Sequence, residues 1–249
     1  MIWDQLTTEE IKKINKTTPV IILLSATEQH GPHLPLSTDR NIGEHFLQEL
    51  NRIMEKEIIL LPIIPIGCSE HHMDFCGSLT FKHNTFKILI EEIVESMYIH
   101  GFKNFLFLNS HGGNQGIGQV ILEALGNKYS LCQFSFITWW KIAGEELKKI
   151  NTSGPGGTGH AGEFETSLML HIAPELVRKQ HLKPPSNQLF DPLIGDMIKG
   201  PQISYFQTIK EISVNGVVGN PSAASKEKGK KISQIITSKL VDFIKSQLI

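Results

Sequence analysis

Histidine and carboxylate side chains are concentrated in residues 27–39, TEQHGPHLPLSTD, directly after an apolar run. In an extended chain Glu28 and His30 point to the same side, because side chains alternate. A carboxylate and an imidazole two residues apart can bind one metal ion together. Asp39 stands where the next helix should begin, so its carboxylate either caps that helix or supplies a third ligand. The stretch therefore predicts a metal site, with a plain polar loop as the alternative.

A second cluster, NSHGGN at 109–114, follows the apolar run NFLFL. Glycines at this point let the backbone approach a ligand closely, and His111 is a candidate metal ligand. The overlapping GGNQGIG does not match the G-x-G-x-x-G register of a dinucleotide-binding turn, and no acidic residue stands at the expected offset. A histidine packed in the core remains the alternative.

The third cluster, HAGEFETSLML at 160–170, combines a histidine with two glutamates at the start of an expected helix. Glu165 precedes apolar residues by three, four and seven positions, so it lies on the apolar face of that helix. A buried carboxylate is unfavourable unless it is paired, protonated or bound to metal, so we expect Glu165 to be a ligand or a general base. Glu163, about 200° away around the helix, is expected to support the site from outside or to face solvent. His160 can transfer protons near neutral pH, with a helix cap and a surface histidine as the alternative.

A fourth stretch, GCSEHHMDFCGSLT at 67–80, follows the second apolar run. Its histidines and carboxylates could add metal ligands, but we expect the stretch to line a substrate pocket. His71 would then contact substrate, and Gly77 and Ser78 would offer backbone amides. Trp139 and Trp140 end the fourth apolar run and are expected to wall the same pocket, with core packing as the alternative.

Apolar runs that alternate with amphipathic stretches predict the elements that must position these clusters. Strands are expected at residues 20–25, 58–66, 104–108 and 131–138. Helices are expected at 38–56, 84–100, 115–128, 162–173 and 222–248. This alternation predicts an α/β fold with a mostly parallel sheet and helices on both faces. Each cluster is expected to begin where a parallel strand ends, which places all four at the edge of the sheet where ligands bind.

Composition restricts the class of protein. The 249 residues hold 24 Lys and Arg against 25 Asp and Glu, so nucleic acid is an unlikely partner. No apolar run approaches the roughly 20 residues of a membrane span, and the first residues do not resemble a signal peptide. Three scattered cysteines do not predict a disulfide framework. We expect a cytoplasmic protein with one domain over residues 1–249, whose irregular residues 180–212 cross the surface or a subunit boundary.

The three motifs at 27–39, 109–114 and 160–170 make the chain resemble the creatininase family of metal-dependent amidohydrolases over its whole length. The resemblance implies a three-layer α/β/α sandwich with a mostly parallel central sheet, often assembled as a hexamer. It also implies two divalent metal ions per subunit, of which nitrogen and oxygen ligands suit Zn²⁺, Mn²⁺ or Fe²⁺. Asp39 matches a bridging ligand and His160 a proton-transfer residue. The implied ligands are Glu28, His30, Asp39, His111 and Glu165.

One position departs from the family pattern. Creatininase itself has a glutamate ligand two residues after the histidine of the NSHGGN-like motif, where this chain has Gly113. Either Glu165 completes the second metal position, or that position is weak or absent. The Cys76-Gly77-Ser78 stretch also departs from the more usual Pro-Gly-Thr. Both differences argue against creatininase proper and favour the wider family.

The sequence therefore predicts a metal-dependent hydrolase that uses activated water to cleave an amide or formamide C–N bond in a small, non-peptide substrate. A cyclic or nucleotide-like substrate fits the resemblance, since relatives include a hydrolase of a pyrimidine-nucleotide formamide. The alternatives are a peptidase that trims a redox-cofactor precursor, a ring-opening hydrolase, and a metal-binding relative without catalysis.

Overall fold

The computed structural model describes residues 1–184, 195–203 and 205–249, and its centre is one parallel sheet. The strands lie in the order β2-β1-β3-β4, so that β1 and β3 occupy the middle. Leu24 at the end of β1 pairs with Asn109 at the end of β3, which in turn pairs with Thr138 at the end of β4. The strand bounds are Val20–Leu24 for β1, Ile59–Leu60 for β2, Asn104–Asn109 for β3 and Gln133–Thr138 for β4.

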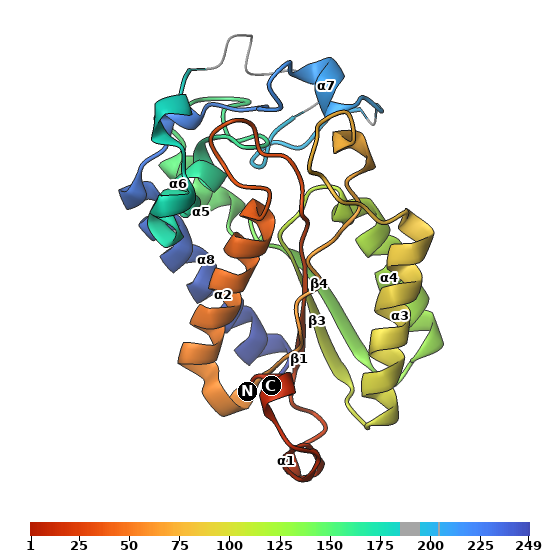
Figure 1. The fold of residues 1–249 in the computed structure, drawn as a ribbon. Coiled ribbons are helices and arrows are strands. Elements are labelled where there is room, and N and C mark those ends of the chain that lie inside the picture. The colour runs from red at the N-terminus through yellow and green to blue at the C-terminus, as the bar shows by residue number, and fades with distance from the viewer. Residues whose placement is uncertain (185–194, 204) are drawn as a thin grey trace.

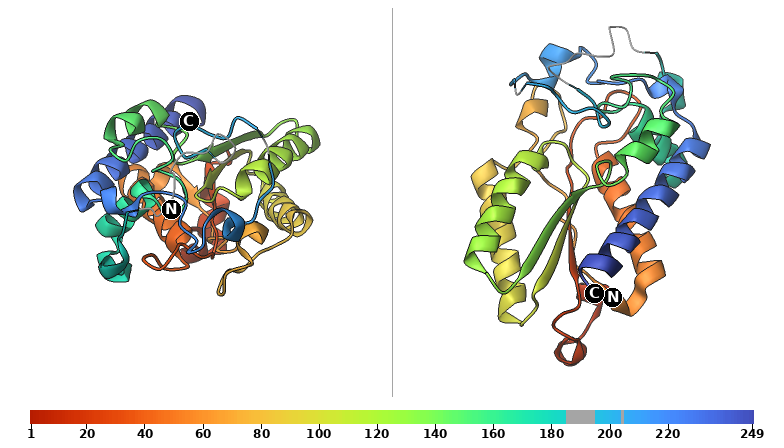
Figure 2. Two further views of the ribbon diagram at one scale, coloured as in Figure 1. Left: turned by 90° about the horizontal axis from the view of Figure 1, so that it is seen from above. Right: turned by 180° about the vertical axis from the view of Figure 1, so that it is seen from behind.

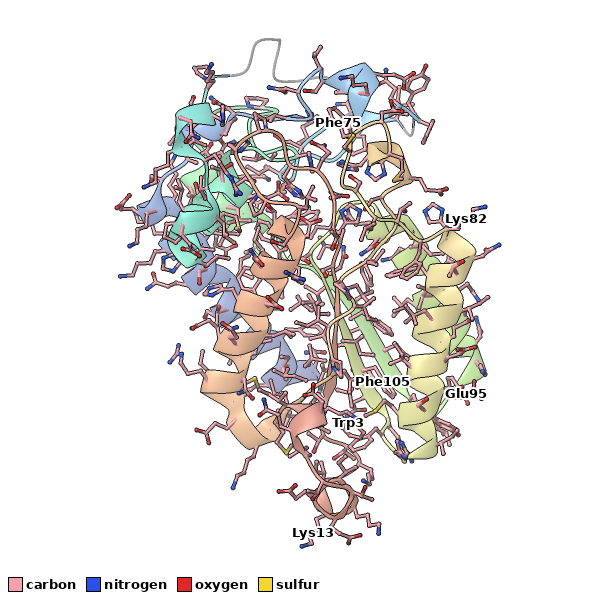
Figure 3. All side chains as sticks on the ribbon, in the orientation of Figure 1. Trp3, Lys13, Phe75, Lys82, Glu95 and Phe105 are labelled. Carbon is pink, nitrogen blue, oxygen red and sulfur yellow. The ribbon has the colours of Figure 1, made fainter. Side chains whose placement is uncertain are left out.

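Helices cover both faces of this sheet, as Figures 1 and 2 show. Ile21 and Leu23 of β1 pack against α2, α5, α6 and α8, whereas Val20, Ile22 and Leu24 pack against α3 and α4. Successive strand residues point to opposite faces, so a wholly apolar strand is required where both faces are buried. Phe105 of β3 lies on the α3 side, where Figure 3 labels it. The predicted α/β/α sandwich is confirmed.

The bounds of the five predicted helices are confirmed to within a few residues, and the three short α-helices α1, α5 and α7 were not predicted. The α-helices are α1 Thr8–Lys13, α2 Thr38–Met54, α3 His83–Ile99, α4 Asn114–Lys128, α5 Gly144–Ile150, α6 Glu163–Ile172, α7 Ile209–Ile212 and α8 Lys226–Gln247. The 3-10 helices are η1 Trp3–Gln5, η2 Glu55–Glu57, η3 Glu70–His72, η4 Pro174–Leu176, η5 Lys179–His181 and η6 Pro221–Ala223. None of the helices in the described ranges is long and apolar enough to span a membrane.

Two expectations about the elements need correction. The second strand is only Ile59–Leu60, with one further bridge from Ile64 to Leu24, because Pro62 and Pro65 have no N–H to donate to a neighbouring strand. The third cluster does not follow a strand: residues 151–162 form a loop that leads into α6. The predicted excursion at 180–212 lies partly outside the described residues, and its described parts are irregular except for η5 and α7.

Connections after β1, β2, β3 and β4 gather at one end of the molecule, opposite both chain termini (Figure 1). The loop from 151 to 162 reaches the same end. This arrangement brings the four histidine and carboxylate clusters to one edge of the sheet, at residues 27–39, 67–80, 109–114 and 160–165.

Candidate metal centre

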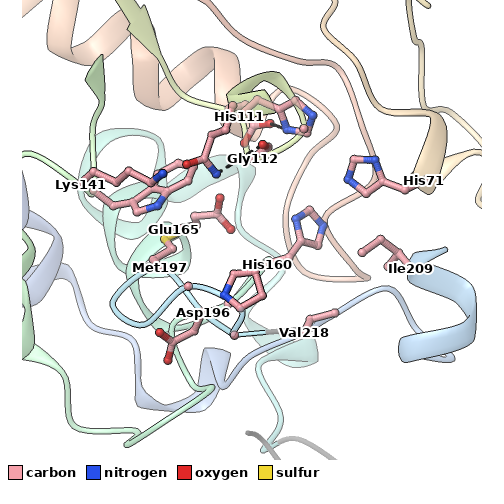
Figure 4. Close-up of a pocket in the computed structure, with 18 of the residues that line it drawn as sticks. His71, His111, Gly112, Lys141, His160, Glu165, Asp196, Met197, Ile209 and Val218 are labelled. Carbon is pink, nitrogen blue, oxygen red and sulfur yellow. Dashed lines mark hydrogen bonds and ion pairs between the residues drawn. The ribbon is translucent and has the colours of Figure 1, made fainter. Parts of the chain in front are cut away.

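A cavity of about 420 Å³ opens at this edge of the sheet. Its lining combines residues from all four clusters, and Figure 4 shows the imidazoles of His71, His111 and His160 around the carboxylate of Glu165. Glu28, His30, Asp39 and Glu165 are each at most 4% exposed. The chain therefore buries several carboxylates and imidazoles together, which requires that they compensate one another or bind a cation.

Glu28, Asp39 and His111 form the first ligand group. His111 Nδ1 lies 3.3 Å from Glu28 Oε1 and 3.1 Å from Asp39 Oδ2. Its other ring nitrogen, Nε2, donates to the carbonyl oxygen of Cys68 at 3.1 Å. That outer hydrogen bond fixes the tautomer and leaves Nδ1 available to a metal ion.

His30, His160 and Glu165 form the second group. His30 Nε2 lies 3.1 Å from Asp39 Oδ1 and 3.8 Å from Glu165 Oε1. Its Nδ1 donates to the carbonyl oxygen of Glu28 at 3.2 Å, so Nε2 is the nitrogen that faces the carboxylates. Asp39 contacts histidines of both groups, one through each oxygen, and this is the position expected of a bridging ligand. Glu28 and His30 both face the centre, but they belong to different groups rather than sharing one as their spacing suggested.

His160 also forms a third group, with Glu28 and His72, and both of these histidines line the cavity. His160 Nε2 donates to the carbonyl oxygen of Gln29 at 2.8 Å, and its Nδ1 lies 3.7 Å from Glu28 Oε1. The side-chain amide of Gln29 donates to Nδ1 of His72 at 2.9 Å. His72 therefore carries its proton on Nε2, which lies 3.3 Å from Oε1 of Glu28. His72 therefore orients the Glu28 carboxylate. The sequence marked His72 only as one histidine of the fourth stretch and did not single out Gln29.

The electrostatics of the centre follow from these contacts. Burial alone would lower the pKa of His30, but the neighbouring Asp39 and Glu165 carboxylates outweigh it and raise that pKa well above its usual value. Glu28 and Asp39 do the same for the pKa of His111. Burial, with the adjacent His30, lowers the pKa of His160 to about 3. The centre is therefore built to hold positive charge between the carboxylates and to keep His160 neutral.

The residues present fit a divalent metal ion. Glu28 Oε2 is buried and has no hydrogen-bond partner among the residues that the structure describes, which is unfavourable for a carboxylate oxygen unless a cation neutralises it. Imidazole nitrogen and carboxylate oxygen are the ligands that zinc and manganese accept. The positive charge that His30 and His111 carry in their protonated forms is the charge that bound cations would replace.

The backbone at Gly113 leaves no space for a side chain. A Cβ atom there would lie 2.1 Å from the carbonyl oxygen of Cys68 and 2.5 Å from Nε2 of His111. A ligand from this position is therefore excluded by geometry as well as by residue type. Glu165 supplies the carboxylate that faces His30, and its Oε2 accepts from the amide of Ala161 at 2.6 Å. Ala161 adopts a φ of 55°, a conformation rare outside glycine, which turns the chain between His160 and α6.

The residues predicted to bind substrate lie in different places. His71 and Trp140 line the cavity. Trp139 is fully buried against Phe46 and does not line the cavity, so it packs in the core instead of contacting substrate. Ser78 Oγ accepts a hydrogen bond from the backbone amide of Gln29 and thereby holds the loop after β1 in place. Gly77 has a φ of 98°, and its turn packs against Leu36 rather than facing the cavity.

Glu163 faces away from the centre, as its helical position predicted, but the option that it faces solvent is wrong. It is fully buried, and its Oε1 lies 2.5 Å from the Nζ of Lys228 in α8. Its other oxygen accepts from the amide of Ser153 at 2.9 Å. Burial would raise the pKa of Glu163, but Lys228 and Ser153 lower it instead.

These residues define an α/β protein that gathers candidate metal ligands at the carboxyl edge of a parallel sheet. The family model for creatininase, creatinine amidohydrolase, matches residues 4–244. The chain belongs to the creatininase family, and the predicted resemblance is confirmed.

Relatives within this family differ in what they are named for. A mycofactocin precursor peptide peptidase of Mycobacterium tuberculosis (strain H37Rv) is 28% identical, over 88% of this chain and 82% of the relative. A 3-dehydro-scyllo-inosose hydrolase of Thermotoga maritima is 23% identical, over 91% of this chain and 76% of the relative. A creatinine amidohydrolase of Pseudomonas putida is 21% identical, over 92% and 89%.

Solved structures show the same fold. A crystal structure of creatinine amidohydrolase superposes with a TM-score of 0.80 at 19% identity, covering 99% of this chain and 97% of that one. A mutant creatininase described as of Zn-Zn type superposes with a TM-score of 0.77 at 20% identity, covering 99% and 98%. All three named relatives are hydrolases, so the chain is a member of a hydrolase family whose substrates differ in kind.

Proposed function

We propose that this protein is a metal-dependent amidohydrolase that cleaves a C–N bond with water. The observation that supports this most is the buried position of Asp39, which contacts His111 beside Glu28 through one oxygen and His30 beside Glu165 through the other. Two divalent ions held by these groups would lower the pKa of water and polarise a carbonyl oxygen. The sequence prediction of Zn²⁺, Mn²⁺ or Fe²⁺ stands as part of this proposal.

Each residue of the centre then has a separate task. Glu28, Asp39 and His111 would hold one ion, and His30 and Glu165, together with Asp39, would hold the other. His72, held by the side-chain amide of Gln29, orients Glu28, and the backbone carbonyl of Gln29 orients His160. Burial would raise the pKa of Asp39, but the adjacent His30 and His111 outweigh it and hold that pKa below its usual value, so this carboxylate binds in its ionised form.

His160 is positioned to move a proton. Its Nε2–H is committed to the carbonyl of Gln29, and its neutral Nδ1 faces the centre beside Glu28. Nδ1 can therefore accept the proton that water loses and pass it to the departing nitrogen, which would otherwise leave as an unstable anion. His160 is only partly exposed, at 16% of its side chain, which limits proton exchange with bulk water.

The substrate we favour is a short peptide or a peptide-like amide. A relative at 28% identity is named a peptidase, whereas the relatives named for small cyclic substrates are 21% and 23% identical. The cavity of about 420 Å³ lies within the range of sites for small ligands, so a folded protein substrate does not fit it. The non-peptide restriction that the sequence suggested is therefore relaxed to amide C–N bonds in general. We also retain the proposal of a cytoplasmic homo-oligomer.

Metal content and turnover of matched variants test this proposal. Protein purified without chelator is expected to hold two ions per subunit by elemental analysis, and Glu165→Ala is expected to hold about one. Glu163→Gln is the control, because it changes a buried glutamate of the same helix that does not face the centre.

His160→Ala is expected to keep both ions and to lose most hydrolysis of a panel of N-acyl dipeptides, formamides and cyclic amides. His83→Ala, at the exposed start of α3, is the control for loss of a histidine. One ion or fewer in wild type, unchanged in Glu165→Ala, would refute the two-ion centre. Full turnover by His160→Ala would remove its role in proton transfer.

A further inference from the structure

Lys141, an exposed residue at the edge of the cavity, is the only lysine or arginine among the described residues that line it. It follows β4 and Trp140, and its backbone amide donates to the carbonyl of Thr138 at 2.9 Å, which fixes the turn that presents it. In Figure 4 Lys141 and His71 lie on opposite sides of the cavity, with Glu165 and His160 between them. No hydrogen bond or ion pair engages its ammonium group within the part of the chain that the structure describes.

The carboxylates of the cavity do not account for this cation. Glu28, Asp39 and Glu165 face the histidines of the metal centre. Asp196 accepts from backbone amides of its own loop and, at 2.7 Å, from the amide of Gly156. Lys141 is therefore a positive charge in a binding cavity whose negative groups are already engaged, which is the arrangement expected where the ligand brings its own anion.

Gln115 supplies a second, independent observation. It lines the same cavity from α4, and its side-chain oxygen is buried with no hydrogen-bond partner among the described residues. Its nitrogen is directed to the carbonyl of Gly112. A buried amide oxygen without a donor is unfavourable, so a ligand N–H at this place would satisfy it.

Lys141 and Gln115 also line a neighbouring recess of about 310 Å³. The rest of that recess is largely apolar, with Phe136, Ile142 and Phe243 among its walls. A ligand held by Lys141 and Gln115 can therefore place an apolar group beside its anion and its N–H.

We propose that Lys141 and Gln115 form the subsite that recognises the carboxylate end of the substrate, and that the substrate is a peptide or N-acyl amino acid with a free carboxyl group. This rests on the proposed amidohydrolase function. The carboxylate binds the Lys141 ammonium, and the N–H of the same residue donates to the Gln115 oxygen. The Lys141 ammonium is a single positive charge with no arginine beside it in the cavity lining. It therefore matches a singly charged carboxylate better than a phosphate, whose two charges require more hydrogen-bond donors. The subsite thus selects acids over the corresponding neutral amides.

Pairs of N-acetyl dipeptides that end in phenylalanine, one as the free acid and one as the carboxamide, test the subsite on the zinc-loaded protein. Wild type is expected to prefer the acid by about tenfold in kcat/KM, mostly through KM, since hydrogen bonds to charged groups have about this strength. Lys141→Gln should bring the acid-to-amide ratio close to one, and Lys141→Glu should reverse it. Lys148→Gln is the control, because this lysine lies on the surface of α5 and does not line the cavity. An acid-to-amide ratio that is the same in wild type and Lys141→Gln would overturn the proposal.

Binding separates this proposal from the proposed function. The same acid and carboxamide are titrated by calorimetry into zinc-loaded wild type and Lys141→Gln. Any affinity of the carboxylate for zinc is common to both proteins, so the difference between them reports Lys141 alone. About tenfold weaker binding of the acid by Lys141→Gln supports the subsite even where no peptide is hydrolysed, and equal binding refutes it. A nucleoside monophosphate is included, and its tighter binding than the acid would also contradict the assignment.

Discussion

The ion pair between Glu163 and Lys228 is expected to be a main determinant of stability at the metal-centre end of the fold. Glu163 is fully buried, and Lys228 is 18% exposed in its side chain. The Lys228 ammonium also contacts Thr152 Oγ1 and the carbonyl of Ala223, each at 2.5 Å. One lysine of α8 thus holds the start of α6, the loop before it and the residues that precede α8. We consider the substitution Lys228→Met, which keeps the length of the side chain and removes the charge.

The expected loss follows from what remains around Glu163. Removing one partner of a buried ion pair destabilises a protein by about 3–5 kcal/mol, because the other charge stays buried. The amides of Thr152 and Ser153 still donate to Glu163, so we expect the lower end, about 3 kcal/mol. For a chain of this size that is a decrease of about 6–12 °C in the melting temperature. Glu163→Gln keeps the acceptor oxygen and should be milder, at roughly 1–2 kcal/mol.

Urea unfolding of chelator-treated protein at pH 7 measures these changes without a contribution from bound metal. The double variant Lys228→Met with Glu163→Gln should be more stable than the sum of the single losses predicts, by about 1–3 kcal/mol. Lys148→Met removes an exposed pair with Glu145 and should change stability by less than about 0.5 kcal/mol.

Because Lys228 lowers the pKa of Glu163, the stabilisation by this ion pair is present above the usual pKa of a glutamate and is lost as the pH falls. A loss below about 1 kcal/mol for Lys228→Met, or strict additivity in the double variant, would refute this account.

Two further outcomes are expected. Gly113→Ala should lower the free energy of unfolding by about 1–3 kcal/mol, because its Cβ would overlap the carbonyl of Cys68, whereas Gly112→Ala meets open space and should be nearly neutral; equal thermal melts would contradict this. Burial lowers the pKa of His33 from 6.5 to about 4, so it folds in its neutral form and its contribution to stability is present above pH 6.5 and lost toward pH 4. The shift corresponds to about 3 kcal/mol, and unfolding curves of His33→Gln between pH 7 and 4 should therefore fall less steeply than those of wild type.

The fold could be predicted from the sequence because its pattern is local. A strand with five apolar residues in succession and helices with apolar residues every three or four positions are each visible in a short window. The second strand was overestimated, although Pro62 and Pro65 marked where pairing fails. The histidine and carboxylate clusters could also be found, because ligand-rich loops at strand ends stand out by residue type.

Contacts between distant parts of the chain could not be predicted in this way. Lys228 lies 65 positions after Glu163, and nothing near Glu163 indicates that a lysine of the last helix will neutralise it. Gln29 bonds to His72 and His160, but its role depends on three loops that meet only in the folded protein. Trp139 and Trp140 are adjacent in sequence, yet one is buried in the core and the other lines the cavity, because successive residues point in different directions.

The position of Glu165 couples one half of the metal centre to the packing of the last helix. Gly113 has no room for a ligand side chain, so the carboxylate that faces His30 comes from α6 instead. α6 packs directly on α8, where Gly229 lets the two backbones approach: a Cβ at that position would lie 1.9 Å from the carbonyl oxygen of Ser167. Glu28 and His111, by contrast, lie on the loops that follow β1 and β3, and Asp39 lies in the first turn of α2. A displacement of α8 would therefore move Glu165 directly through α6, whereas it would reach the first group only through Asp39, because α2 carries that residue and its His45 bonds to Ser233 of α8.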